Sequence, residues 1–188
     1  MTDQTKKQTW GIGSLAMAAA VVVAINGLYM LLVAIGNIFD YQTNFDFVNH
    51  VLRMDTTNFG QGEGVNLDPD VIGRAITNET LITIAYVGVI IWESLAALVL
   101  IYATFLWIKS SKTKLYFAAR KFSTIGLLMI VVLFMGGFIT IGGEWFQMWR
   151  SVEWNGLEPA FRNSVLAIFG LVLVHLPSPQ WLTDEPVE

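Results

Sequence analysis

The sequence predicts an all-α protein that lies in a membrane, and two observations predict it. Of its 188 residues, 54% are hydrophobic and only 14% are charged, and the mean hydropathy is +0.56. A water-soluble domain of this size is less apolar. A helix needs about 20 apolar residues to cross the hydrocarbon layer, and the chain has three such segments and a shorter fourth. We therefore expect four transmembrane helices in a single membrane domain, 1–188.

The predicted parts alternate between spans and loops. The four spans are expected at about 14–38, 81–108, 122–143 and 161–177. Two outer loops, 39–80 and 144–160, follow the first and third spans, a basic inner loop, 109–121, follows the second, and an inner tail, 178–188, follows the fourth. Lys6 and Lys7 precede the first span as they would in a signal peptide. Its apolar run is too long for one and no clean cleavage site follows, so we expect a retained anchor.

Basic residues predict the orientation. Most of them fall on one side of the predicted membrane domain: Lys6, Lys7, Lys109, Lys112, Lys114, Arg120 and Lys121. Because cytoplasmic loops carry an excess of Lys and Arg, we expect a bacterial inner-membrane protein with both termini in the cytoplasm. Tryptophans gather at both interfaces of membrane proteins. They are predicted at the inner interface (Trp10, Trp107, Trp181) and at the outer one (Trp145, Trp149, Trp154).

The first outer loop is expected to carry short helices. Phe45, Val48, Val51 and Leu52 recur at helical spacing, which predicts an amphipathic helix lying on the membrane or on the bundle. The stretch 58–70 is rich in glycine and acidic residues and reads as a loop, and a second short helix is expected around 72–76.

Glu93 falls near the centre of the second span, because it lies twelve residues after Leu81 and each helical residue adds about 1.5 Å. An acid there is costly unless it is paired, protonated or in contact with water. Tyr86 shares its face, and Asn26 and Asn37 share a face of the first span, with Asn26 expected at the depth of Glu93. Two interpretations stay open. Glu93 holds helices together by hydrogen bonds, or it serves a proton relay, ligand or cofactor.

The run from Gly142 to Arg150 puts Glu144 at the predicted outer rim. Around it we expect a cluster of aromatic, basic and amide side chains: Trp145, Arg150, Trp154, Asn155, Arg162 and Arg74. Glycines let another helix approach closely, and the third span has several: Gly126, Gly136, Gly137, Gly142 and Gly143. We therefore expect a packing seam that ends at Glu144, neutralised by one of the arginines. A binding cleft is the alternative.

Several classes of function and site are excluded or disfavoured. The chain has no cysteine, so it has no disulfide, thiol nucleophile or Cys-ligated metal site. No nucleophile elbow, P-loop or HExxH motif is present, so we favour a protein that is not an enzyme. The net charge is -4, and nucleic acid is not an expected partner. His50 and His175 fall on opposite sides of the membrane, which argues against haem.

Metal sites have weak candidates in the outer loop. His50 with Asp46 and Asp55 could hold a metal ion or act in acid–base chemistry, and Asp68 and Asp70 could bind calcium. A solvated surface is the commoner outcome for such residues. We therefore predict no metal and no cofactor, with a bound lipid or quinone as the one ligand left open.

Short motifs along nearly the whole chain carry a family resemblance: Thr43-Asn44-Phe45, Phe47-Val48, His50-Val51-Leu52, Met54-Asp55-Thr56-Thr57, Arg74-Ala75-Ile76, Trp92-Glu93, Gly142 to Trp149, Trp154-Asn155-Gly156 and Ala160-Phe161-Arg162. With them the chain resembles the bacterial family of predicted small integral membrane proteins, a domain of unknown function. The resemblance implies a four-helix inner-membrane protein and brings no assigned activity, substrate or cofactor. The chain departs from the family between Thr57 and Arg74, where its loop is longer, and at Gly73, where a Trp is expected.

Three functions remain as hypotheses. The small size, the lack of catalytic motifs and the glycine-rich third span favour a non-catalytic accessory or scaffold subunit of a larger membrane complex. Its partners would be membrane lipids and other membrane protein subunits. A small transporter or channel that uses Glu93 and Asn26 is the first alternative. A lipid- or quinone-binding protein or membrane enzyme acting at the outer rim is the second.

Overall fold

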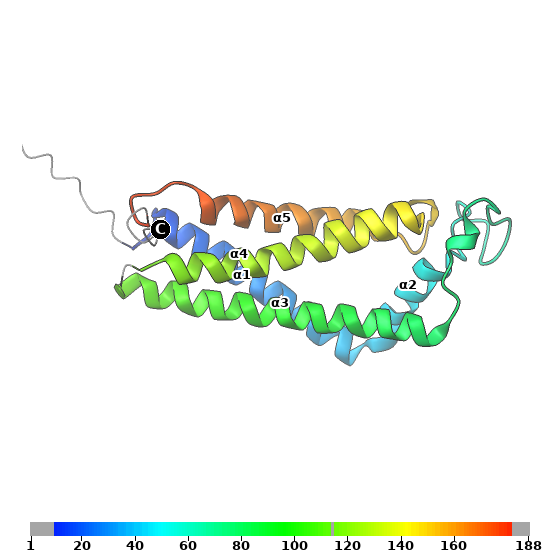
Figure 1. Cartoon of the computed structure of the whole chain (residues 1–188), viewed down its shortest axis with the longest axis horizontal. Helices are drawn as coiled ribbons and strands as arrows, with labels where there is room; N and C mark the ends of the chain where they lie inside the picture. The colour runs from blue at the N-terminus through cyan, green and yellow to red at the C-terminus, as the bar shows by residue number, and fades with distance from the viewer. Residues whose placement is uncertain (1–9, 114, 182–188) are drawn as a thin grey trace, which may run out of the picture.

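The computed structural model describes residues 10–113 and 115–181, and the described residues contain helices and no strand. Four long helices, each apolar and long enough to cross a membrane, lie side by side as a bundle (Figure 1). The all-α fold with four spans is therefore confirmed. Lys6, Lys7, Lys114 and residues 182–188 lie outside the described residues, so their predicted sides of the membrane stay predictions.

The second and third spanning helices are longer than the apolar segments of the sequence. The four spanning helices are α1 (Leu15–Phe39), α3 (Glu79–Thr113), α4 (Phe117–Val131) continued by the π-helix η2 (Val132–Trp145), and α5 (Leu157–His175). The second span was expected at 81–108, but α3 extends past both limits. Hydropathy detects only the apolar part of a helix, whereas Glu79 and Lys112 continue the same helix with polar side chains.

Polar residues fix where two of the helices begin. Ser14 Oγ accepts a hydrogen bond of 3.2 Å from the backbone N–H of Met17 and caps α1. Asn78 Oδ1 accepts bonds of 3.0 and 3.2 Å from the N–H groups of Thr80 and Leu81 at the start of α3. The first turn of a helix has N–H groups without helical partners, and these side chains satisfy them.

The connection between α1 and α3 carries two helical elements, as predicted. The amphipathic helix α2 (Tyr41–Arg53) lies against the end of the bundle, and one turn of 3-10 helix, η1 (Ile72–Arg74), replaces the helix expected around 72–76. The end of the bundle with α2 and residues 54–78 is called the loop end here (Figure 1). The opposite end, with Lys109, Lys112, Arg120 and Lys121, is called the basic end.

Close packing of the bundle centres on Leu100, which is fully buried. A Cβ on Gly27 of α1 would lie 3.0 Å from Leu100 Cβ, and one on Gly126 of α4 would lie 2.5 Å from Leu100 Cγ. Both glycines therefore let α1 and α4 approach α3 across this side chain. The expected seam on the third span thus exists at Gly126 and again at Gly143, where a Cβ would lie 2.9 Å from Leu157 Cδ2 of α5. It is interrupted at Gly136 and Gly137, which have open space where a Cβ would be.

The last part of the third span is a π-helix, which the sequence analysis did not predict. At its end the backbone N–H of Phe146 donates to the carbonyl of Ile141, five residues earlier, at 3.0 Å. The side chain of Thr140 also donates to the carbonyl of Met135, at 2.8 Å. Such widened turns are rare and concentrate at functional sites. Here η2 forms one wall of the hollows described below.

At the basic end, four aromatic rings pack into what we call the aromatic cluster: Trp10, Trp107, Tyr116 and Trp181. Trp107 and Trp181 are fully buried. These tryptophans lie at the end of the bundle where the inner interface was predicted, and their packing into one cluster was not predicted. The cluster joins the start of the described chain, the end of α3 and the segment after α5, and each packed pair of rings adds to the stability of this end.

Candidate functional site

Glu93 lies on the buried face of α3 with only 3% of its surface exposed. Tyr86, two turns earlier on the same face, is also buried. The inward direction follows from the apolar residues at helical spacing on this face, such as Ala96, Ala97 and Leu100. The structure thus brings together the acid and the phenol that the sequence placed on one helix face.

Asn37 is the partner of Glu93. Its side-chain Nδ2 donates a hydrogen bond of 2.6 Å to Glu93 Oε2, and the Tyr86 hydroxyl donates to the backbone carbonyl of Asn37 at 3.3 Å. Only the Asn37 amide, among the side chains of the described residues, makes a hydrogen bond with the Glu93 carboxyl group. The second carboxyl oxygen is therefore available to another molecule.

Asn26 does not lie at the depth of Glu93, so that prediction is wrong. Its Nδ2 donates to the carbonyl of Val22 in its own helix at 2.9 Å. Gly27 packs against Leu100, which puts Asn26 about 10 Å farther along α3 than Glu93. The reason is that α3 extends past the end of α1 at the loop end, which the apolar limits of the two spans do not reveal.

The Glu93 cavity, a hollow of about 230 Å³, lies beside these groups. Its polar lining comes from α1, α2, α3 and α5: Tyr29, Asn37, Asn44, Tyr86, Glu93 and Asn163. Asn163 Nδ2 donates to the Tyr29 hydroxyl at 2.8 Å and so links α5 to α1. Phenyl rings form much of the remaining wall: Phe47, Phe134 and Phe138. None of the described lining residues is Lys or Arg.

A second hollow, of about 150 Å³, is wholly apolar and lies between α2, α3 and η2. It shares four wall residues with the Glu93 cavity: Phe47, Val48, Val89 and Phe138. These four side chains therefore separate the partly polar Glu93 cavity from the neighbouring apolar hollow. Pockets that bind small molecules combine an apolar wall with a few convergent polar groups in this way.

Toward the basic end, the interior of the bundle is filled. Ala96, Ala97, Leu100, Ala103 and Trp107 succeed one another along α3 and are all fully buried. The Glu93 cavity therefore has no open connection through the described part of the bundle to the basic end.

The residues predicted to form one outer-rim cluster lie at the loop end but do not make one site. Arg74 lies over the Trp145 ring at 5.0 Å, and Arg162 pairs with Glu158 at 3.2 Å. Asn155 Oδ1 accepts a bond of 3.1 Å from the N–H of Leu157 at the start of α5. Among the described residues the arginines thus take partners other than Glu144, which is exposed. The prediction that Glu144 forms an ion pair with one of these arginines is therefore wrong.

Arg150 takes Asp68 as its partner. The Arg150 Nη1 to Asp68 Oδ2 distance is 2.8 Å, and the guanidinium lies 5.2 Å from the Trp149 ring centroid. The hydrogen bond from Arg150 holds the pKa of Asp68 below its ordinary value. Asp68 Oδ1 also accepts from the N–H of Asp70 at 3.0 Å. Asp68 is thereby used to fasten the acidic loop to the 3-10 turn η3 (Met148–Arg150).

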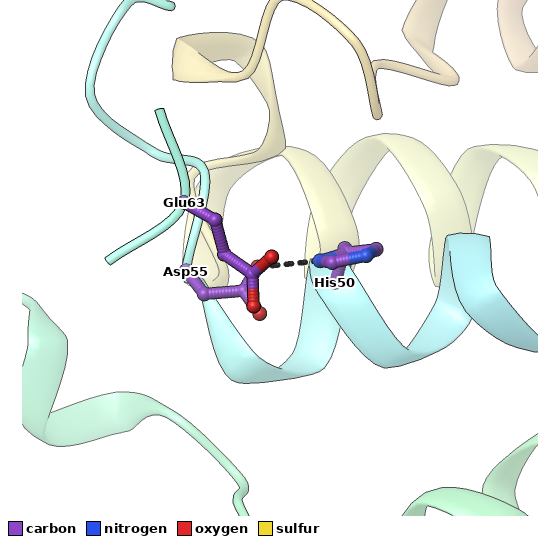
Figure 2. Close-up of side chains that lie close together, drawn as sticks. All are labelled: His50, Asp55 and Glu63. Carbon is purple, nitrogen blue, oxygen red and sulfur yellow. Dashed lines mark hydrogen bonds and ion pairs between the residues drawn. The ribbon is translucent and has the colours of Figure 1, made fainter. Parts of the chain in front are cut away.

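His50 meets Asp55 and Glu63 at the loop end (Figure 2). The His50 Nδ1 to Asp55 Oδ1 distance is 2.9 Å, and one ligand atom from each of the three side chains lies within 4.8 Å of the others. The weak metal candidates Asp68 and Asp70 do not join this group among the described residues, because Arg150 engages Asp68. Glu63 was missed, since only the fold of the acidic loop brings it to α2.

Comparison with protein families gives one match. The profile of the predicted small integral membrane proteins, domain of unknown function 2165, matches residues 15–177. The chain belongs to this family. Neither the curated proteins nor the solved structures include one that matches. Membership in the family means that the chain is a small integral membrane protein that sits in lipid, and the matched range includes all four spanning helices and both hollows.

Proposed function

We propose that this family member binds a small membrane-soluble molecule in the Glu93 cavity and does not transform it. The observation that carries the proposal is a buried carboxyl group with one oxygen engaged by Asn37 and the other available beside a hollow. An acid inside a membrane is costly and points to a role. No group of described side chains in the cavity has the pattern of a nucleophile with its base, so binding is favoured over a reaction.

The lining selects the polar end of the bound molecule. An anionic head group would meet the Glu93 carboxyl group without any basic residue among the lining residues to offset the repulsion. An uncharged hydrogen-bonding group or an organic cation would be accepted. A cation gains further from the aromatic walls, since ring faces attract positive charge, and Tyr29, Tyr86 and Phe138 are among those rings.

The apolar hollow provides space for the apolar part of such a molecule. Its wall of aliphatic and phenyl side chains adjoins the Glu93 cavity at Phe47 and Phe138, so an apolar chain could continue there from a polar end at Glu93. The class proposed is therefore an amphipathic molecule with an uncharged or cationic polar end, which includes a quinone and excludes an anionic lipid. A pore through one chain lacks support, because the bundle is filled from Ala96 to Trp107.

Three probes with the same twelve-carbon chain test this. Dodecyltrimethylammonium, dodecanol and dodecanoate are titrated into the purified protein in a neutral detergent, and binding is followed by calorimetry. We expect the first two to bind and dodecanoate not to bind. In Glu93→Gln the affinity for the cation should fall about tenfold or more, the effect of losing one buried charge partner. Glu158→Gln, an exposed acid of α5, is the control. Equal binding of all three probes to wild type and to Glu93→Gln would refute the proposal.

A second candidate is the non-catalytic accessory subunit of a membrane complex. The observation that favours it is that Gly88 of α3 and Gly136 of η2 face open space: a Cβ added at either glycine would have no atom within 4 Å. Glycines on the outside of a spanning helix permit close approach of another helix. Native mass spectrometry after mild extraction should then find a defined assembly that Gly88→Leu dissociates and Val87→Leu, at an exposed neighbour, leaves intact. Recovery of the chain alone would count against this candidate.

For the membrane, we propose the bacterial inner membrane with the basic end in the cytoplasm. Support comes from Lys109, Lys112, Arg120 and Lys121 at that end and the preference of basic loops for the cytoplasm. The chain has no cysteine, so Gln61→Cys and Lys112→Cys can be labelled singly in whole cells with an impermeant maleimide. Labelling of Gln61→Cys alone is expected, and labelling of Lys112→Cys alone would reverse the orientation.

A further inference from the structure

We propose that His50, Asp55 and Glu63 form a binding site for a divalent transition-metal ion of the zinc class. The three residues lie close together at the loop end (Figure 2), and none of them lines the Glu93 cavity. The three side chains come from α2, from the turn after it and from the acidic loop. They supply one imidazole nitrogen and two carboxylates, a donor set that suits zinc or manganese better than calcium, which prefers oxygen ligands throughout.

The distances suit a shared ion. Two atoms that bind one tetrahedral zinc ion at about 2.1 Å lie roughly 3.4 Å apart. His50 Nδ1 and Asp55 Oδ1, which share a hydrogen bond, are 2.9 Å apart, so an ion that replaces the shared proton requires a shift of only about 0.5 Å. The ligand atoms of all three residues lie within 4.8 Å of one another. Glu63 is exposed, so its side chain is free to rotate and close the remaining gap.

The backbone around Glu63 holds it toward His50. Gly62 and Gly64 on either side have φ angles of +100° and +72°, which glycine adopts without strain. The N–H of Gly64 donates to the carbonyl of Asp55 at 2.7 Å. The buried Asn58 side chain donates to the carbonyl of Gly62 at 2.5 Å. These contacts therefore hold the loop so that Glu63 lies close to Asp55, just after α2.

The surroundings orient the histidine and favour a cation. The Trp154 ring stacks on the His50 ring with centroids 4.6 Å apart and an interplanar angle of 17°, which restricts the imidazole to one plane. A hollow of about 200 Å³ adjoins the group and is lined by a further acid, Glu153, and by no Lys or Arg among the described residues. His50 is thus the one basic side chain in contact with these acids among the described residues of the hollow, and the hollow leaves room for water in an open coordination position.

Zinc binding to the untagged full-length protein tests the site. The protein is treated with EDTA, dialysed in a neutral detergent and titrated with Zn²⁺ in a calorimeter. We expect one ion per chain, and an affinity reduced about tenfold or more in His50→Gln and in Glu63→Gln. Glu153→Gln, an acid of the same hollow outside the proposed ligand set, should stay within about twofold, well under the loss expected on removal of a ligand.

X-ray absorption at the zinc edge provides a readout that does not depend on affinity. Nitrogen and oxygen ligands are expected, with the nitrogen lost in His50→Gln. A large excess of Ca²⁺ should leave zinc bound, and its displacement by Ca²⁺ would overturn the assignment to a transition metal. The site is refuted if wild type binds no zinc, or if His50→Gln and Glu63→Gln both bind it as wild type does. Because Glu63 is an exposed loop residue, Glu63→Gln retains the fold and keeps this comparison informative.

Discussion

The side-chain amide of Asn37 donates a hydrogen bond of 2.6 Å to the carboxyl group of Glu93 and so joins α1 to α3 inside the bundle. Both side chains are buried, with 8% of Asn37 and 3% of Glu93 exposed. A hydrogen bond between spanning helices stabilises a membrane protein by about 0.6 kcal/mol on average. Loss of one partner costs more, because the other polar group is left unsatisfied.

Asn37→Ala should therefore destabilise the protein more than Asn26→Ala. Removal of Asn37 leaves the Glu93 carboxyl group without its partner, at a cost of about 1–3 kcal/mol. Among the described residues the Asn26 side chain bonds to Val22 of its own helix, so its removal leaves no described side chain of another helix unpaired. Unfolding midpoints in detergent measure the difference in stability between the two variants. Both variants remove the same side-chain volume, so a difference reports the lost hydrogen bond. Equal losses would show that the pair contributes nothing specific.

Gly126→Ala should destabilise the bundle by about 1–3 kcal/mol, the usual effect of overpacking. The added Cβ would lie 2.5 Å from Leu100 Cγ, and Leu100 is fully buried. Gly88→Ala is the matched control on an exposed helix face with nothing within 4 Å. There the change should stabilise α3 by up to about 1 kcal/mol, because Ala favours helix. The prediction fails if both variants unfold at the same denaturant concentration.

Trp181→Ala should loosen the basic end. Trp181 is fully buried and packs edge-on against Trp107 and Tyr116, and loss of a buried Trp costs about 3–5 kcal/mol. Trp149→Ala, at an exposed ring of the loop end, should cost much less. Thermal unfolding in detergent compares the two variants, and an equal shift of both midpoints would contradict the prediction.

The ion pair of Asp68 with Arg150 should weaken in acid. The pKa of Asp68 lies below its ordinary value of 3.8, chiefly because of the hydrogen bond from Arg150. A lowered folded-state pKa means that the stabilisation is complete above the ordinary pKa and is lost as pH falls through the folded-state value. In Asp68→Asn the acidic loop should therefore exchange its amide hydrogens faster than in wild type near neutral pH. That difference should shrink when the pH falls below 3.8.

Asp70→Asn serves as the control for this experiment, since Asp70 contributes its backbone N–H and not its carboxylate to the contact with Asp68. Its exchange should match wild type at each pH. A loop that responds to Asp70→Asn as strongly as to Asp68→Asn would indicate a general charge effect in place of the ion pair.

The sequence was sufficient for the fold because the bilayer imposes it. Apolar runs long enough to span the hydrocarbon must be helices, and helical spacing placed Tyr86 and Glu93 on one face of the second span. The first and last apolar residues of two spans do not reveal how far one helix is shifted along the bundle axis relative to the other. That shift decided that Asn37, and not Asn26, meets Glu93.

The loop end was less predictable for a different reason. Its contacts join residues far apart in sequence, such as Asp68 with Arg150 and His50 with Trp154, and no period or motif encodes them. The π-helix also escaped prediction, because its composition of glycine and apolar residues is that of an ordinary spanning helix. An arginine partner for Glu144 was predicted because Arg74, Arg150 and Arg162 fall on the same predicted side of the membrane, but these arginines have other partners.

Helix α2 has no fully buried residue, yet its Phe47 and Val48 form part of the wall of both hollows. Elements with few buried contacts detach with a small free energy, whereas a packed core separates only with the whole fold. If the proposed ligand binds beside Glu93, a local detachment of α2 would open this wall while the four spanning helices stay together. Release of that ligand would then depend on the contacts of one short surface helix as well as on the stability of the bundle.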